Sequence, residues 1–230
     1  MKRLLLSAAL ALSLHTAQAV TLVYDTTLAL PGTTSAAEPQ LAGVVLEDKM
    51  SDFSIAALGI SGKIQSRVVR SDLDGTLDFY WRIFNDPNSS GALGVFRIGE
   101  FYAPEFNANW RIDGLGDVGP ASARMYGGAS IGKGYINFNF LSAASGAGSL
   151  APGESSNFIL MDTSAVYYNE TSLMDVANIG TTKASDLMAT FGPSAVPEPG
   201  SYALLGLGLA VLGLARSRST AVPDYVRATS

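Results

Sequence analysis

Several aspartates lie close together in two glycine-containing segments, and carboxylate oxygens are the ligands that Ca²⁺ prefers. Asp72, Asp74 and Asp78 occur in the sequence SDLDGTLD, while Asp113 and Asp117 flank the sequence GLG. Neither spacing matches the EF-hand loop. Asp, Gly and Ser are also the ordinary residues of tight turns. We therefore expect two polar turns without a metal ion, with Asp78 on the solvent face of the following strand, and calcium binding stays open as an alternative.

A pair of carboxylates can hydrolyse a glycosidic bond, but Glu100 and Glu105 have no pattern that places them opposite each other. His15 is the only histidine, it lies near the N-terminus, and the chain has no cysteine. The rest of the chain therefore cannot build a catalytic triad with histidine, or the usual zinc and iron sites that need imidazole. We predict no catalytic residue, no cofactor and no enzymatic activity. A carboxylate-based polysaccharide hydrolase or lyase is the less favoured alternative.

Aromatic side chains offer a different chemistry, because a sugar ring can stack on them. The candidates are Tyr80, Trp81, Phe101, Tyr102 and Trp110. Trp81 falls on the apolar face of its predicted strand, so we expect it in the core. Trp110 has polar neighbours and is the better candidate for an exposed ring. A polysaccharide-binding module, with or without calcium, is therefore the main alternative function.

The charge of the chain excludes one class of partner. It carries 20 Asp and Glu against 15 Lys and Arg, a formal net charge of −5, and the excess of acidic residues is concentrated in residues 20–196. Nucleic-acid binding needs a basic patch that displaces counterions from phosphates. We therefore expect no nucleic-acid partner. Without cysteine there is also no disulfide framework, so stability must come from buried apolar surface.

The elements that must position these residues are strands, because hydrophobic residues alternate with polar ones. In residues 76–84 (TLDFYWRIF), Leu77, Phe79, Trp81 and Ile83 share one face. Further strands are predicted at residues 21–30, 52–58, 63–70, 93–101, 106–112, 133–141, 157–162 and 166–168.

Turn residues separate these predicted strands, as at Pro31-Gly32 and Asp113-Gly114. Residues 172–190 instead show weak helical spacing and are expected to form an amphipathic helix. Many short strands with regular turns are typical of an antiparallel β-sandwich. The fold prediction is therefore a mainly β protein whose body, residues 20–192, is a single antiparallel β-sandwich domain.

The N-terminus has the three parts of a secretory signal peptide. Lys2 and Arg3 precede an apolar stretch over residues 4–14, and Ala17 and Ala19 form a small-x-small cleavage site. Residues 1–19 are therefore predicted to be a signal peptide that is cut after Ala19.

The C-terminus carries a second export feature. The residues Val196, Pro197, Glu198 and Pro199 lie in a predicted linker, residues 193–201, which ends at an apolar run over residues 202–215. A helix of this length covers about 20 Å, against about 30 Å for the hydrocarbon core of a bilayer. That is short for a permanent span, although a thinned bilayer can accept it. We predict a short transmembrane sorting helix.

Arg216 and Arg218 follow the apolar run and begin a basic tail, residues 216–230, which the positive-inside rule places in the cytoplasm. A Pro-Glu-Pro segment, a Gly/Leu/Ala-rich helix and a basic end resemble the PEP-CTERM signal of Gram-negative bacteria, whose substrates are processed by the membrane transpeptidase exosortase. The resemblance implies passage through the inner membrane to the cell surface or extracellular matrix, and a link to exopolysaccharide or biofilm. The chain differs from that pattern in continuing for several residues beyond Arg218.

Overall fold

The described part of the chain forms two antiparallel sheets of six strands each. The computed structural model describes residues 19–103, 106–127, 135–141, 148–181 and 183–194. Sheet A contains, from edge to edge, β1 (Val20–Thr21), β7 (Phe106–Trp110), β10 (Ile159–Thr163), β5 (Leu77–Asn85), β4 (Ile60–Ser71) and β3 (Gly43–Ile55). Sheet B contains, from edge to edge, β12 (Met188–Pro193), β11 (Tyr168–Asn178), β6 (Leu93–Gly99), β9 (Tyr135–Asn139), β8 (Ser122–Tyr126) and β2 (Thr27–Ala29).

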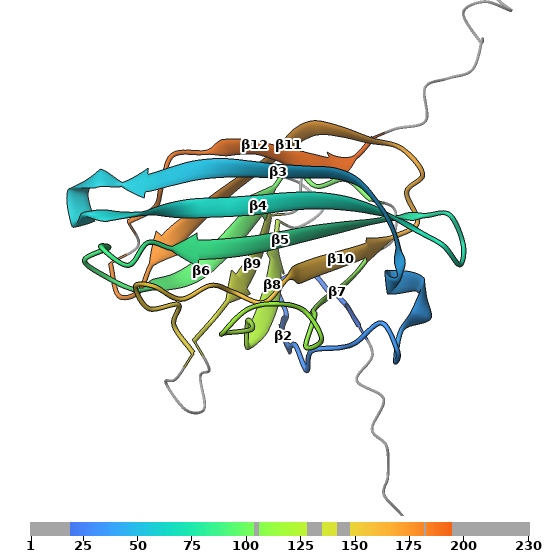
Figure 1. The fold of residues 1–230 in the computed structure, drawn as a ribbon, viewed down its shortest axis with the longest axis horizontal. Coiled ribbons are helices and arrows are strands. Elements are labelled where there is room, and N and C mark those ends of the chain that lie inside the picture. The colour runs from blue at the N-terminus through green and yellow to red at the C-terminus, as the bar shows by residue number, and fades with distance from the viewer. Residues whose placement is uncertain (1–18, 104–105, 128–134, 142–147, 182, 195–230) are drawn as a thin grey trace, which may run out of the picture. The chain divides into compact units, whose positions relative to one another are not determined.

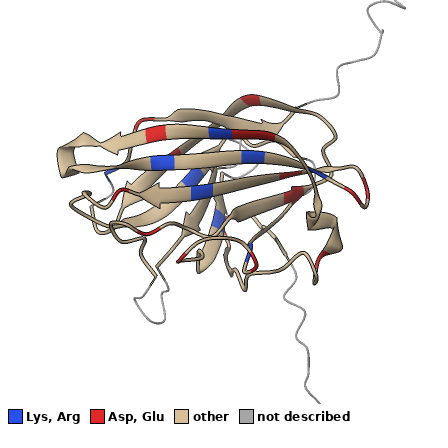
Figure 2. Cartoon of the chain, viewed as in Figure 1, with Lys and Arg blue, Asp and Glu red and all other residues tan. Residues whose placement is uncertain are grey.

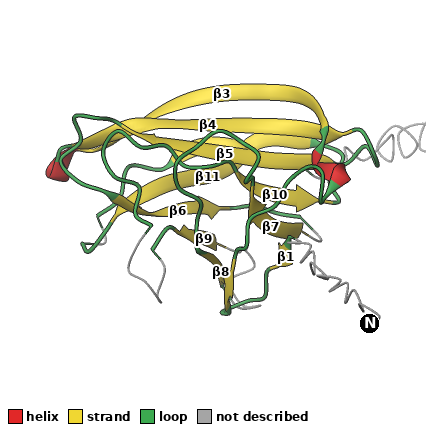
Figure 3. Ribbon diagram, turned by 60° about the horizontal axis from the view of Figure 1, so that its bottom comes forward, coloured by secondary structure: helices red, strands yellow, loops and turns green. Residues whose placement is uncertain are grey.

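The two sheets lie face to face, with sheet A in front of sheet B in Figure 1, and one large apolar cluster fills the space between them. Figure 3 shows the same layers from a second side. The antiparallel β-sandwich predicted from the sequence is therefore confirmed.

Strand β5 shows why the alternation was informative. Leu77, Phe79, Trp81 and Ile83 are all completely buried or nearly so, as predicted. Phe101 meets Phe79 edge to face, with 5.3 Å between ring centroids. Such aromatic packing adds to the stabilisation that burial of these large side chains provides.

A short chain of hydrogen bonds joins the two sheets inside the core. Trp81 Nε1 of sheet A donates to Thr190 Oγ1 of sheet B at 2.7 Å, and Thr190 Oγ1 donates to Ser66 Oγ of sheet A at 3.1 Å. Ser66 Oγ in turn lies 3.6 Å from Met174 Sδ. Buried polar groups are costly unless they are paired, so these bonds permit an indole and two hydroxyls in an otherwise apolar interior.

The outer face of β5 differs from the prediction. Asp78 and Tyr80 were expected on a solvent-facing surface, but both are buried. Residues 33–42, which include the 3₁₀ helix η1 (Pro39–Leu41), lie over this part of sheet A. Leu41 forms a second small apolar cluster there with Val69, Tyr80 and Leu160. The alternation within β5 alone cannot show that a segment distant in the sequence buries its outer face.

The predicted helix over residues 172–190 is wrong. This segment contains most of β11 and the start of β12, which pair antiparallel, and Gly180 with φ +85° lies between them. Every second residue from Ser172 to Val176 is buried, which is the period of a strand. Apolar residues on the other face of β11 hid this period in the sequence.

Strand boundaries differ in two other places. The predicted strand over residues 21–30 is divided between β1 in sheet A and β2 in sheet B. The strand predicted at residues 52–58 begins in the last part of a much longer strand, β3, whose first part is largely exposed and therefore lacks an apolar pattern. The last three residues of the predicted range form a 3₁₀ helix instead, η2 (Ala56–Leu58). No helix in the described ranges is long and apolar enough to cross a membrane.

Candidate functional site

Most of the predicted sorting and cleavage residues lie outside the described part of the chain, as do the predicted sorting helix at 202–215 and the tail at 216–230. Those residues are Ala17, Val196, Pro197, Glu198, Pro199, Arg216 and Arg218. Ala19, the other residue of the predicted cleavage site, is described. It immediately precedes β1, the first strand of the body.

The most unusual chemistry in the body is a pair of aspartates on the outer face of sheet A. Asp78 of β5 and Asp162 of β10 are directly opposite each other in the strand register. Asp78 is completely buried, and neither of its carboxyl oxygens has a hydrogen-bond donor. Burial raises the pKa of Asp78 to about 9, and the charge of Asp162 adds to that rise.

The surroundings of Asp162 act on its pKa in both directions. Burial raises this pKa, whereas interactions with Asp78, Gln40 and Asn107 lower it, and the net direction is upward. Asp78, with a pKa of about 9, is protonated at neutral pH. Two like charges on directly opposite residues are thereby avoided.

Glu38, which belongs to the covering segment 33–42, is a second buried carboxyl group on this side of sheet A. It lies just before η1 and is only 5% exposed. The backbone N–H of Ala19 donates to Glu38 Oε1, whereas Oε2 makes no hydrogen bond of good geometry. Burial raises the pKa of Glu38, and the charge of Asp162 opposes its ionisation further.

The aspartates of the first predicted turn do not form a ligand cluster. Asp74 Oδ1 accepts hydrogen bonds from the backbone and hydroxyl of Thr76, at 3.0 and 2.6 Å, which holds the turn and lowers the pKa of Asp74. Asp78 faces Asp162 instead, and the backbone N–H of Asp72 donates to Ala42. Among the described residues, no group of three or more Asp, Glu, His or Cys side chains is placed to hold a metal ion.

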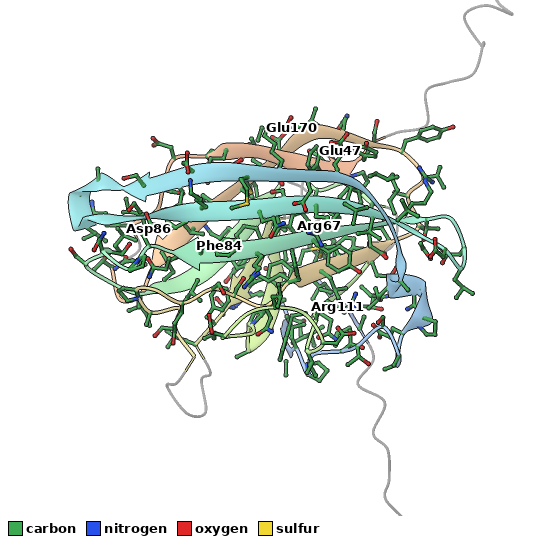
Figure 4. The ribbon with its side chains drawn as sticks, in the orientation of Figure 1. Glu47, Arg67, Phe84, Asp86, Arg111 and Glu170 are labelled. Carbon is green, nitrogen blue, oxygen red and sulfur yellow. The ribbon has the colours of Figure 1, made fainter. Side chains whose placement is uncertain are left out.

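The aspartates of the second predicted turn bind protein groups. Asp113 accepts from Arg111 Nε at 2.5 Å and Nη2 at 2.9 Å, and this lowers the pKa of Asp113 to about 2. In Figure 4, Arg111 lies at the end of the sandwich near η1. Asp117 accepts from the backbone and hydroxyl of Ser155 at 2.8 and 3.0 Å. Both aspartates therefore fasten loops.

The predicted aromatic platform is not a single surface. Tyr80, Trp81 and Phe101 are buried, whereas Tyr102 is 44% exposed. Trp110, expected to be the exposed ring, is half-buried and packs against the apolar core. Its indole carbons would lie within 2.5 Å of a Cβ at Gly119, so the loop backbone passes directly over the ring. The polar neighbours of Trp110 misled the prediction because they point to the other side of β7.

Of the two glutamates considered for glycoside hydrolysis, Glu105 lies outside the described residues. Glu100 follows β6 with a positive φ of 56°.

An open polar surface crosses the outer face of sheet B. Arg124, Asn137, Arg97 and Asp175 are register partners in the neighbouring strands β8, β9, β6 and β11. Arg97 Nε donates to Asp175 Oδ1 at 2.6 Å and Nη2 donates to Oδ2, a bidentate ion pair. Charges of both signs on the two sheets are drawn in Figure 2.

Two tyrosines complete this surface. Tyr126 and Tyr135 are register partners at its edge and are 37% and 44% exposed. The guanidinium of Arg124 lies 4.6 Å from the centre of the Tyr126 ring. The Tyr135 ring lies over Gly99, where a Cβ would come within 2.5 Å of it. We call this surface the sheet B strip, defined as Arg97, Arg124, Tyr126, Tyr135, Asn137 and Asp175.

Sequence reasoning missed Asp162, Glu38 and the sheet B strip. Asp162 ends a predicted strand and looks like an ordinary polar residue. Its partner on β5 is 84 positions away in the chain, since Asp162 is opposite Asp78. The strip was hidden because its residues belong to four strands and align only through the register.

Comparison with known proteins identifies the C-terminal segment alone. The family model described as the PEP-CTERM protein-sorting motif matches residues 195–219. No curated protein and no solved structure matches the chain.

Proposed function

We propose that this chain, which carries a PEP-CTERM sorting motif and is thereby an exported protein that exosortase sorts, is a non-enzymatic protein of the cell surface or extracellular matrix. The observation that carries the proposal is the match over residues 195–219, which contains Pro197, Glu198 and Pro199. We further propose a Gram-negative host, export by an N-terminal signal peptide, and a role linked to exopolysaccharide or biofilm.

The sorting signal acts, in this proposal, through backbone shape and charge. Pro197 and Pro199 fix φ and keep the residue before each proline extended, so Glu198 is presented on a stiff segment. The apolar run at 202–215 holds that segment at the membrane. Arg216 and Arg218 keep the tail in the cytoplasm and leave the body on the far side, where exosortase can act on it.

Processing is tested by intact-mass measurement of the surface form. We expect the wild-type form to lack residues 202–230. Replacing Pro197, Glu198 and Pro199 together by alanine should leave the tail attached and hold the protein at the inner membrane. The matched control is Pro152→Ala, which replaces an exposed proline of the body and should be processed normally. A wild-type surface form that retains the tail would show a permanent anchor instead of a sorting signal.

The non-enzymatic role is supported by the residue types of the body and by the contacts that its aspartates make within the protein. The body has no histidine or cysteine. Asp113 and Asp117 fasten loops, and the Asp78–Asp162 pair lies under residues 33–42. The purified protein should show no turnover of polysaccharides or esters. Turnover that is lost in Asp162→Asn would favour the hydrolase or lyase alternative.

A second candidate function, binding of a matrix polysaccharide, is favoured by the sheet B strip. Its tyrosine faces can stack on sugar rings, and its Arg and Asn groups can hydrogen-bond hydroxyls. The Tyr135 ring is held in place by the close backbone of Gly99. Calcium dependence of such binding is part of this alternative.

This candidate is tested with exopolysaccharide purified from the host culture. Tyr135→Ala should reduce binding about five- to thirtyfold, since stacking on one aromatic ring contributes on the order of 1–2 kcal/mol. Tyr167→Ala removes a tyrosine that is equally exposed but lies outside the strip, and it should bind like wild type. Equal affinity of all three proteins would reject the strip as a glycan site.

A further inference from the structure

Glu38 combines three features that a purely structural carboxylate seldom has. It is only 5% exposed, its Oε1 accepts a hydrogen bond from the backbone of Ala19, and its Oε2 makes none of good geometry. The hydroxyl of Thr33 is near enough to affect Glu38, but it too makes no well-aligned hydrogen bond. Buried charge without a full set of partners is destabilising.

The backbone on both sides of Glu38 is held in place. Glu38 N donates to Thr34 O at 3.0 Å, and Leu41 N donates to Glu38 O at 3.0 Å. Leu41 is anchored in the small apolar cluster on sheet A. The backbone of Glu38 therefore cannot move away from the sheet without the loss of these contacts.

No side chain on the described elements around Glu38 neutralises it directly. Asp162 of β10 contributes a like charge. Arg111, which follows β7, is the favourable charge, but its guanidinium binds Asp113 through Nε and Nη2 and Leu41 O through Nη1. The backbone that meets Glu38 Oε1 is a different kind of partner, because cleavage of the chain directly after Ala19 creates a charged amino group there.

That backbone is the predicted signal peptidase site. Cleavage after Ala19 turns the amide nitrogen of Val20 into an α-ammonium group. Three covalent bonds join this nitrogen to that of Ala19, so the two are at most about 3.7 Å apart. β1 pairs with β7 through Val20 and Ala108, which fixes the new end of the chain beside η1.

We propose that Glu38 is the binding site for the α-ammonium group of the processed N-terminus. The proposal rests on the signal peptide of the proposed function. In the precursor, the amide supplies one N–H and no charge. After cleavage the ammonium supplies three donors and a positive charge, which can satisfy both oxygens of Glu38. Removal of the signal peptide thus completes the cover of sheet A.

The first measurement identifies the N-terminus. Intact mass and N-terminal sequencing of the exported protein should give Val20 as its first residue. A different first residue would overturn the cleavage assignment, and this proposal with it, before the role of Glu38 is examined.

The second measurement is the rate at which an acylating reagent modifies the Val20 amine at neutral pH, followed by mass spectrometry. We expect the rate to be at least about tenfold higher in Glu38→Gln than in wild type, because a paired ammonium is a poor nucleophile. Glu170→Gln removes the exposed partner of Lys49 and should leave the Val20 rate unchanged. Equal rates in wild type and Glu38→Gln would overturn the proposal.

An insertion separates this role from a structural one. Two residues, Gly-Ser, placed directly after Ala19 move the new ammonium away from Glu38 but restore a backbone amide beside it. The proposal expects fast acylation and a lower thermal midpoint for this form. An unchanged midpoint would show that Glu38 needs only an amide. Should Glu38→Gln not fold, the insertion form and wild type still decide the question.

Discussion

The outer faces of the two sheets share the same strand alternation but have opposite surroundings. On sheet A, residues 33–42 cover part of the sheet and bury Asp78 and Tyr80, and Glu38 of the covering segment is buried as well. On sheet B, Tyr135 and the guanidinium of Arg97 remain accessible to solvent. The comparison shows that a covered face turns carboxyl groups into pH-dependent contributors to stability, whereas an open face keeps its polar groups available for a partner. Three predictions compare the two outer faces with each other and with the inner core that both sheets share.

The largest effect is expected in the shared core. Phe79→Ala should lower the free energy of unfolding by about 3–5 kcal/mol, because it removes a completely buried ring and leaves a cavity between the sheets. Tyr167→Ala, at an exposed position, should change it by less than about 0.5 kcal/mol. Urea unfolding followed by circular dichroism measures both, and similar losses would mean that Phe79 is not in the core.

The next effect concerns the covered face of sheet A. The pKa of Asp78 is about 9 in the folded protein, above its ordinary value of 3.8. Between these values the folded state holds a proton that the unfolded state has released. Stability therefore falls as pH rises from about 4 to 9, with a slope of up to about 1.4 kcal/mol per pH unit.

Asp78→Asn should make this slope clearly shallower, because the amide does not titrate, whereas Asp162 and Glu38, whose pKa values are also raised, keep their own smaller contributions. Urea midpoints between pH 5 and 9 measure it. Asp52→Asn, at an exposed carboxylate, should keep the slope of wild type. Asp113 has the opposite sign, because its pKa of about 2 gives stability that is lost only as pH falls below about 4. A slope as steep in Asp78→Asn as in wild type would show that the proton is held by another group.

The smallest effect is expected on the open face of sheet B. Arg97→Ala leaves the Asp175 side chain, which is 6% exposed, without its bidentate partner. Because Arg97 is 39% exposed, water screens part of the loss, and we expect about 1–2 kcal/mol. Arg97→Lys keeps the positive charge but cannot form the bidentate contact, so it should lose less stability than Arg97→Ala.

Lys63→Ala breaks the exposed ion pair with Asp52 and serves as the control, with no measurable change expected. Thermal unfolding of the variants in low and high salt measures both pairs. If Arg97→Ala and Lys63→Ala lowered stability equally, the Arg97–Asp175 pair would contribute no more to stability than an ordinary exposed ion pair.

The sequence predicted the inner core well and the outer faces poorly. The alternation in β5 identified Leu77, Phe79, Trp81 and Ile83, because one strand with a buried face has period two whatever surrounds it. The same pattern placed Asp78 in solvent, because nothing local shows that residues 33–42 return over the sheet. The helix predicted at 172–190 failed since β11 buries residues on both of its faces, which obscures the period.

The candidate sites divide in the same way. The C-terminal signal is continuous in sequence, and it was recognised from Pro197, Glu198, Pro199 and the arginines. Glu38 and Asp162 acquire their properties from register and burial across the fold. Single-sequence patterns contain no information on which strand lies beside which, so these sites require the structure.

Strand order also determines when the body can fold. β10 lies between β5 and β7 in sheet A, although more than 40 residues separate it from each along the chain. β1 and β2, at the N-terminus, pair with β7 and β8. Contacts so distant in sequence carry a large loop-closure entropy and make folding slow. Sheet A cannot become continuous until residue 163 has been synthesised, so the core of the body forms only after most of the chain is available.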